Sequence, residues 1–236
     1  MRTSILLGLS FCIAFTSTPT VCQTSASVGA VRTHVEGIEI PALANAPFTA
    51  RIVVTWNEPL VGGGTLSRKY YTSVARDSQG RVHREIREFV PADSTAEPPL
   101  RSFTVLDPVS ATRTVCTKAS MTCATSAFHP RVLLADNADT GAGTNVTRES
   151  LGQQTMDDLP VVGTRETVSN AGASRIALSH TDVWYSSDLH MDLSVVRNTP
   201  QLGEVTLQVT NLVRGEPDPS WFSIPSGYQV GGGAAQ

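Results

Sequence analysis

The chain has 236 residues, of which 40% are hydrophobic and 17% charged, and its formal net charge is −3. Charged residues are scarcer than the roughly 25% of an average soluble domain, while serine and threonine together number 50. Threonine favours β-strands, so the composition predicts a β-rich protein. The slightly acidic balance argues against a nucleic-acid-binding protein, which would carry a basic face, and the apolar content argues against a disordered chain.

Residues 1–23 have the pattern of a signal peptide. Arg2 precedes an apolar run that is too short to span a bilayer. Cleavage could follow Cys22, Gln23 or Ala26, and we favour Gln23. A lipid-modified Cys22 and a retained anchor are the alternatives. We therefore expect an exported protein, periplasmic or secreted, with no transmembrane segment in its mature part.

Short runs of alternating apolar and polar residues, separated by turn residues, follow at regular intervals. We expect an irregular N-terminal segment over residues 24–46, a single antiparallel β domain over 47–230 and a disordered tail over 231–236. About eleven strands would form a meander curled into an open or half barrel, with little helix. The predicted strands are Phe48–Trp56, Thr65–Arg76, Arg81–Val90, Arg101–Leu106, the two arms of a hairpin turning at residues 119–120, Phe128–Leu134, Asn145–Gln154, Leu159–Ser169, Ser174–Ser186, Leu189–Asn198 and Glu204–Val213.

Two local irregularities are predicted near the C-terminus. The apolar alternation of the last strand changes phase before Leu212, which indicates a β-bulge. Asp218 and Pro219 suit the N-cap and first position of one helical turn, which would pack Trp221, Phe222 and Ile224 inward.

Two cysteines, Cys116 and Cys123, belong to the mature part of the chain. A hairpin turn centred on Ala119 and Ser120 places them opposite each other, close to disulfide geometry. An oxidising compartment favours the bond. A redox pair and free thiols are the alternatives, although the spacing differs from Cys-x-x-Cys.

The search for catalytic motifs finds no nucleophile elbow, zinc-protease motif, P-loop or dinucleotide fingerprint. We therefore expect a protein that is not an enzyme, and we assign no catalytic residue and no cofactor. One polar cluster has metal-binding chemistry: His180, Asp182, His190 and Asp192 would share a face if their hairpin turned at Ser187, and such a set suits zinc or manganese. We prefer the reading in which these side chains form a solvated strand face, and we assign no metal ligand.

A second polar feature is a locally basic stretch. Its members are Arg76, Arg81, His83, Arg84, Glu85 and Arg87. It could contact anionic lipid headgroups or a partner, but we favour a charged outer strand face that discourages edge pairing.

Five segments carry a resemblance to known proteins: 76–85, 151–154, 163–167, 184–189 and 216–225. They resemble, in the same order, a family of uncharacterised bacterial secreted proteins that has no assigned activity. More distantly, the strand pattern resembles the half-barrels of periplasmic lipoprotein-carrier and lipoprotein-sensor proteins. That resemblance implies about eleven antiparallel strands around an apolar cavity that accepts acyl chains. Those carriers cover the cavity with helices, for which this sequence shows no amphipathic segment.

Together these features predict a non-enzymatic exported protein whose concave sheet face binds a lipid or an acylated partner, with no nucleic acid involved. The first alternative is a structural or partner-binding envelope module whose core is filled by its own tail at Trp221 and Phe222. The second alternative is a metal-dependent enzyme on the His/Asp cluster.

Overall fold

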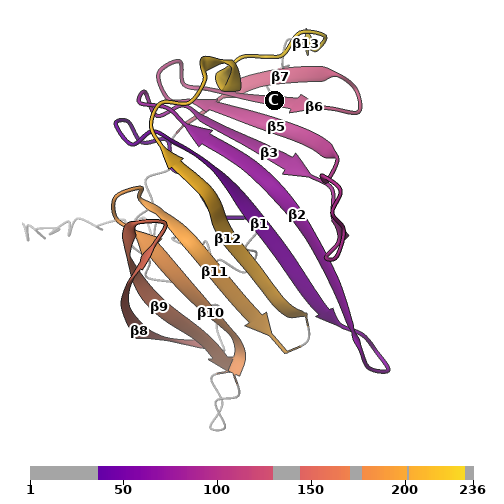
Figure 1. Ribbon diagram of the computed structural model, residues 1–236, viewed down its shortest axis with the longest axis vertical. Helices are drawn as coiled ribbons and strands as arrows, with labels where there is room; N and C mark the ends of the chain where they lie inside the picture. Colours follow the sequence, from indigo (N-terminus) through magenta and orange to yellow (C-terminus); the bar gives the residue numbers. More distant parts are fainter. Residues whose placement is uncertain (1–36, 130–143, 171–176, 201, 232–236) are drawn as a thin grey trace, which may run out of the picture.

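The computed structural model describes residues 37–129, 144–170, 177–200 and 202–231, which form one large curled sheet (Figure 1). The predicted signal peptide, most of the N-terminal segment and residues 232–236 of the predicted tail lie outside the described residues. The predicted strand Phe128–Leu134 lies beyond them after His129, and its first two residues form no strand. No helix in the described ranges is long and apolar enough to cross a membrane.

The strands fall into two arms. The first arm comprises β1 (Phe48–Pro59), β2 (Thr65–Arg76), β3 (Val82–Arg87), β4 (Val90–Pro91), β5 (Leu100–Asp107), β6 (Thr112–Thr117) and β7 (Thr122–Ala127). The second comprises β8 (Thr144–Met156), β9 (Leu159–Asn170), β10 (Ala177–Ser186), β11 (Met191–Thr199) and β12 (Gly203–Arg214), followed by the 3-10 helix η1 (Pro219–Phe222) and β13 (Gln229–Gly231).

The strand order is β13-β7-β6-β5-β3-β2-β1-β12-β11-β10-β9-β8, with β4 paired to β2. All these pairs are antiparallel except β13 with β7, and the described strands leave the sheet open between β8 and β13. The prediction of a mainly β, open antiparallel sheet with little helix is therefore confirmed. The order differs from a simple meander because β1 pairs with β12, which places Ile52 opposite Val209 and Val54 opposite Leu207 at the centre of the sheet.

The sheet curls so that its two arms approach each other on one side, which we call the inner face. Arg76 at the end of β2 donates from Nη2 to the carbonyl of Leu189, between β10 and β11, at 2.9 Å. These positions are at least three strand spacings apart, about 14 Å in a flat sheet. A single side chain can join them only because the sheet is curved.

The main core lies on the inner face. Ile38 and Ile40, in the segment before β1, pack there against strands of both arms. Its buried members are Ile38, Ile40, Phe48, Ala50, Ile52, Val54, Val74, Val82, Leu159, Val161, Leu189, Met191, Leu193, Val195, Leu207 and Val209.

A smaller core lies on the opposite, outer face at the β5–β7 end. Phe103, Val105, Cys116 and Cys123 are buried there, and Cys116 is joined to Cys123 by a disulfide across the β6–β7 hairpin. Successive side chains of a strand point to opposite faces of the sheet, so Phe103 faces outward while its neighbour Thr104 faces inward with Arg84. The C-terminal tail covers this outer core.

The predicted helical turn is present, with the Asp218 side chain accepting a hydrogen bond from the Ser220 amide. Phe222 packs on the outer core, and the Trp221 ring meets the His83 ring edge-on at 5.0 Å. Both side chains are half-buried, whereas Ile224 is exposed, so the prediction that all three pack inward holds for two. The idea that Trp221 and Phe222 fill the concave face is wrong, because the tail crosses the outer face.

The predicted bulge in the last strand is confirmed. The register between β1 and β12 shifts between Thr49, which faces Val213, and Arg51, which faces Thr210. The extra residue is on β12, where Asn211 has a φ of 51°.

The first prediction concerns Arg76, whose side chain is fully buried. Replacing it in Arg76→Met removes the donors to three backbone carbonyls, those of Ala46, Pro41 and Leu189. Buried acceptors without partners are costly, so the free energy of unfolding should fall by about 3 kcal/mol in urea titrations. Arg214→Met, at an exposed position, is the control and should cost less than about 0.5 kcal/mol. A loss as small as the control's would contradict this role.

The second prediction concerns pH. Burial between Phe103 and Trp221 lowers the pKa of His83, against smaller opposing effects of a backbone hydrogen bond at Trp221 and the charge of Glu85. The unfolded chain protonates this group near its ordinary pKa of about 6.5, before the folded chain does. The folded state should therefore keep its full stability above pH 7 and lose part of it as the pH falls below about 6.5.

The check is to compare the free energy of unfolding at pH 7.5 and pH 5.5. His83→Gln should lose less stability on acidification than the unmodified protein, whereas His180→Gln should lose about as much as the unmodified protein. An equal loss in the His83 variant would show that this side chain does not titrate in the way described.

Candidate ligand-binding cavity

A cavity of about 900 Å³ opens on the inner face of the first arm, within the range of about 300–1,000 Å³ for small-molecule pockets. One wall is the segment before β1, and the floor is formed by β2, β3, β5 and β6. The lining residues are Gly37, Glu39, Ile40, Pro41, Ala42, Tyr70, Thr72, Val82, Arg84, Ile86, Arg101, Thr104, Leu106, Arg113, Ala127, Phe128 and His129.

Strand register explains which side chains form the floor. Val82 faces Leu106 across β3 and β5, and Arg84 faces Thr104 one step further along. Directly opposed residues share a face, and so do residues two apart on one strand. The alternation in these strands thus sends one set of side chains into the cavity and the other set to the outer face.

The wall of the cavity is fixed to the floor by arginine side chains. Arg84 donates from Nη1 to the carbonyl of Ile38 at 3.4 Å, and Arg76 donates from Nη1 to the carbonyl of Pro41 at 3.1 Å. A Cβ atom at Gly37 would meet the Arg84 guanidinium, so a larger residue there would require the Arg84 side chain to shift. The burial of Ile38 and Ile40 holds the same segment against the sheet.

The charged lining is mostly basic. Arg84, Arg101, Arg113 and His129 surround the cavity, and Glu39 is its one acidic member. Within the described parts of the chain, the exposed side chains of Arg101 and Arg113 make no hydrogen bond and no ion pair. The cavity therefore has a mixed lining, in which apolar side chains lie beside Arg101 and Arg113, whose guanidinium groups remain available to an anion.

The rest of the predicted basic stretch is divided between other environments. Arg76 is buried in the inner core, Arg81 pairs with Asp77 at 2.6 Å, and His83 lies under the tail. The expectation that this strand discourages edge pairing is wrong, because β3 lies between β2 and β5 inside the sheet.

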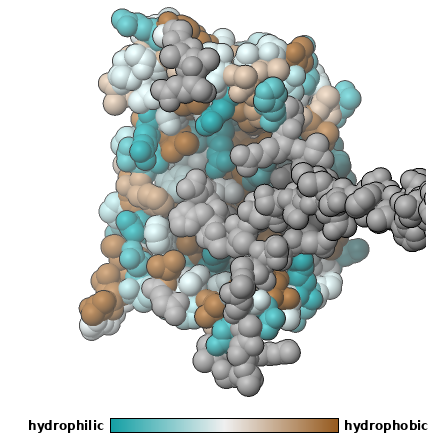
Figure 2. Space-filling model, turned by 180° about the vertical axis from the view of Figure 1, so that it is seen from behind, coloured by the Kyte–Doolittle hydropathy of each residue, from teal (hydrophilic) through white to brown (hydrophobic). Residues whose placement is uncertain are grey.

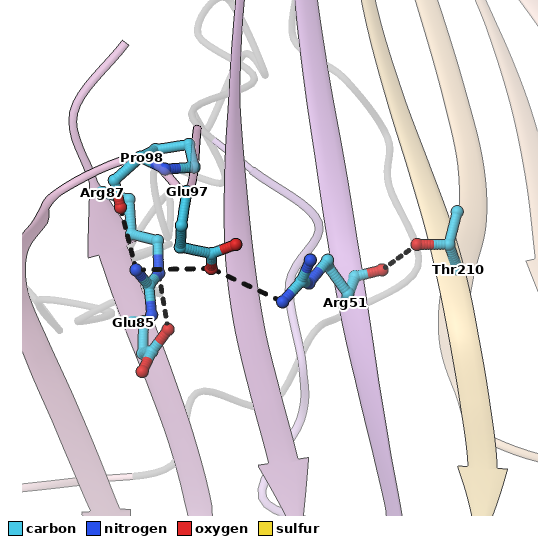
Figure 3. Close-up of polar contacts among 6 residues, drawn as sticks. All are labelled: Arg51, Glu85, Arg87, Glu97, Pro98 and Thr210. Atoms are coloured by element: carbon cyan, nitrogen blue, oxygen red, sulfur yellow. Dashed lines mark hydrogen bonds and ion pairs between the residues drawn. The ribbon is translucent and has the colours of Figure 1, made fainter. Parts of the chain in front are cut away.

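Arg87 belongs to an ion-pair network on the outer face (Figure 3). It donates to Glu85 at 2.8 Å and to the carbonyl of Pro98 at 2.8 Å, while Glu97 lies between Arg87 and Arg51 at 3.4 and 3.5 Å. These contacts attach the proline-rich loop before β5 to the outer face. Because the charges pair with one another, the network is structural.

The predicted His/Asp cluster does not assemble. Asp182 faces Val196 and His180 faces Asn198, because the β10–β11 hairpin turns further along the chain than Ser187 and carries a bulge after Trp184. No group of three or more His, Cys, Asp or Glu residues able to hold a metal occurs among the described residues.

Asp182 instead accepts two hydrogen bonds from Arg165, from Nε and Nη2, each at 2.6 Å. These bonds lower the pKa of the Asp182 carboxyl below its usual range. The ion pair joins β9 to β10, so Asp182 has a structural role that needs no metal ion.

Sequence reasoning did not identify the cavity residues. Arg84 was counted only as part of a basic stretch, and Arg101 and Arg113 were not singled out. The alternation of side chains along this strand could have pointed to the cavity, since Val82, Arg84 and Ile86 share one strand face with apolar neighbours. The wall could not be foreseen, because its position depends on contacts with Arg76 and Arg84 that are distant in sequence.

No protein-family model and no curated protein matches this chain. Among solved structures, it is similar to MucB in complex with MucA(peri), with 14% identity and a TM-score of 0.41 over 80% of this chain and 58% of that chain. It is also similar to LprF from Mycobacterium bovis, with 15% identity and a TM-score of 0.31 over 76% and 89% of the two chains. A LolA superfamily protein from Nitrosomonas europaea matches with 9% identity and a TM-score of 0.29 over 78% and 93%. The chain spans 58% of the length of the MucB chain.

Proposed function

We propose that this protein is a non-enzymatic exported protein, periplasmic or secreted, that binds a lipid or the acyl chain of an acylated partner in the inner-face cavity. The observation that carries the proposal is the cavity of about 900 Å³, whose lining combines apolar side chains with several basic ones. Pockets of this size that bury most of a ligand are lined mainly by apolar side chains with a few placed polar groups. We assign no catalytic residue to it.

The apolar part of the lining suits hydrocarbon. It comes from the N-terminal wall, from β3 and β5, and from the end of β7 with the residue that follows: Ile40, Pro41, Ala42, Val82, Ile86, Leu106, Ala127 and Phe128. Transfer of an acyl chain from water onto such a surface is favourable in proportion to the apolar area that it buries.

The basic part of the lining suits an anionic end group. Arg101 and Arg113 are exposed at the cavity, and a guanidinium can donate two parallel hydrogen bonds to a carboxylate or phosphate. The ligand class that matches both parts is an anionic amphiphile, such as a fatty acid or an acidic phospholipid.

One observation favours the alternative of a partner-binding module with a self-filled core. Ile38 and Ile40 already occupy much of the inner face and are almost completely buried. In that case the cavity would be a gap beside a plug formed by the N-terminal segment, and the protein would carry no ligand.

The third prediction separates these two functions. Protein purified under native conditions is denatured, its lipids are extracted, and they are quantified by mass spectrometry against the protein concentration. We expect an acyl lipid with an acidic headgroup at close to one per chain. Preparations that are consistently empty would favour the self-filled module and contradict the carrier.

The fourth prediction tests the basic lining. In Arg101→Glu/Arg113→Glu the affinity for a fluorescent fatty acid should fall about tenfold, and the effect should shrink at high salt, because exposed charges are screened. Arg214→Glu, on β12 outside the cavity lining, is the matched control and should change the affinity less than twofold. Equal affinities in the two variants would show that the cavity arginines do not contact the ligand.

A further inference from the structure

Five large apolar side chains are exposed together at the end of the sheet where the β1–β2 and β11–β12 hairpins turn. Val61 is fully exposed, and the other four are 42–58% exposed. We call this set the apolar tip: Leu60, Val61, Leu66, Phe89 and Leu202.

Contacts around Trp56 bring these residues to one place. The Trp56 indole donates from Nε1 to the carbonyl of Leu202 at 3.0 Å, and its ring lies 6.3 Å from that of Phe89. Gly203, next to Leu202, lies directly against the backbone at Asn57, so the two hairpin turns are adjacent. The tip is thus one patch built from three segments of the chain.

The β1–β2 turn is uncharged and has open space around its backbone, which suits contact with a lipid surface. Residues 59–67 carry no charge, and Gly62, Gly63 and Gly64 all have positive φ with nothing packed against them. Figure 1 shows this hairpin reaching past its neighbours, and the same corner of the molecule is brown and white at the lower left of Figure 2.

Cations and aromatic rings lie directly behind the tip. The Arg68 guanidinium lies over the Trp56 ring at 5.0 Å, and the Lys69 ammonium lies over the Tyr71 ring at 5.9 Å. Lys69 is three strand residues from Leu66, a distance of about 10 Å. This spacing fits a lipid leaflet, in which apolar groups enter the acyl region while aromatic rings and cations lie at the headgroups.

We propose that the apolar tip inserts into a lipid bilayer that contains anionic lipids. A bilayer fits the tip because its uncharged glycines and apolar side chains precede cations by about the depth of a headgroup layer. The tip also continues towards the cavity: the Phe89 ring contacts the Tyr70 ring at 4.7 Å, and Tyr70 lines the cavity. If the cavity holds a lipid, as the proposed function states, the Phe89–Tyr70 contact connects the inserted tip to the cavity lining.

The fifth prediction tests insertion by co-sedimentation with vesicles of phosphatidylethanolamine and phosphatidylglycerol. In Leu60→Ser/Val61→Ser the partition coefficient should fall at least about tenfold, because two apolar side chains are lost from the acyl region. Val109→Ser is the matched control: Val109 is 74% exposed in the β5–β6 turn at the other end of the sheet. The control should stay within about twofold of the unmodified protein.

A charge variant tests the orientation. Lys69→Glu should weaken binding to these vesicles about fivefold or more, and the difference should vanish on phosphatidylcholine vesicles, which carry no net charge. An unmodified protein that does not bind vesicles, or a tip variant that binds like the Val109 control, would overturn the proposal. A tip variant that converts a dimer into a monomer without changing vesicle binding would overturn it in favour of a second copy as the occupant.

The fatty-acid assay keeps this proposal separate from the proposed function. The tip variants should bind a fluorescent fatty acid as the unmodified protein does, because none of the substituted residues lines the cavity. Loss of vesicle binding with retained fatty-acid binding supports the tip. Vesicle binding that depends on the tip in a protein with no fatty-acid binding would leave the tip supported and contradict the cavity.

Discussion

The fold depends on one buried cation. The Arg76 side chain is fully buried, lies 5.0 Å from the Phe48 ring, and donates to the carbonyls of Ala46, Pro41 and Leu189. Burial lowers the pKa of Arg76 to about 10, which shows how unfavourable the site is for a charge. Such a charge is tolerated only when its hydrogen bonds are satisfied. These three bonds hold the N-terminal segment on the sheet and join the two arms, so they stabilise both the curled sheet and the cavity wall.

Because side chains alternate along the strands, the cavity lies on the inner face of the sheet and the core covered by the tail lies on the outer face. On the inner face the alternation places Val82, Arg84 and Leu106 around the cavity. On the outer face it places His83 and Phe103 under the C-terminal tail, beside the disulfide. The tail can therefore stabilise the cavity strands without occupying the cavity. A single layer of sheet has in this way both a stabilised side and a side open to a ligand.

Much of the fold could be predicted because the signals are local. Strand alternation, the symmetric spacing of Cys116 and Cys123 about their turn, and the Asp218 cap each depend on a few neighbouring residues. The β10–β11 register could not be predicted, since its turn places His190 at a φ of 55° and a bulge follows Trp184. The pairing of β1 with β12 and the burial of Arg76 depend on residues more than 100 positions apart. The cavity depends on both, so its residues could not be assembled from the sequence.

Hydrogen exchange of the backbone amides, measured with and without palmitate, would locate the site on the protein that receives an anionic acyl ligand. If palmitate occupies the inner-face cavity, exchange should slow in residues 37–42 and in β2, β3 and β5 around Tyr70, Arg84 and Leu106, with no change in β8 and β9. Unchanged exchange around the cavity, or protection confined to the outer face, would contradict binding in this cavity.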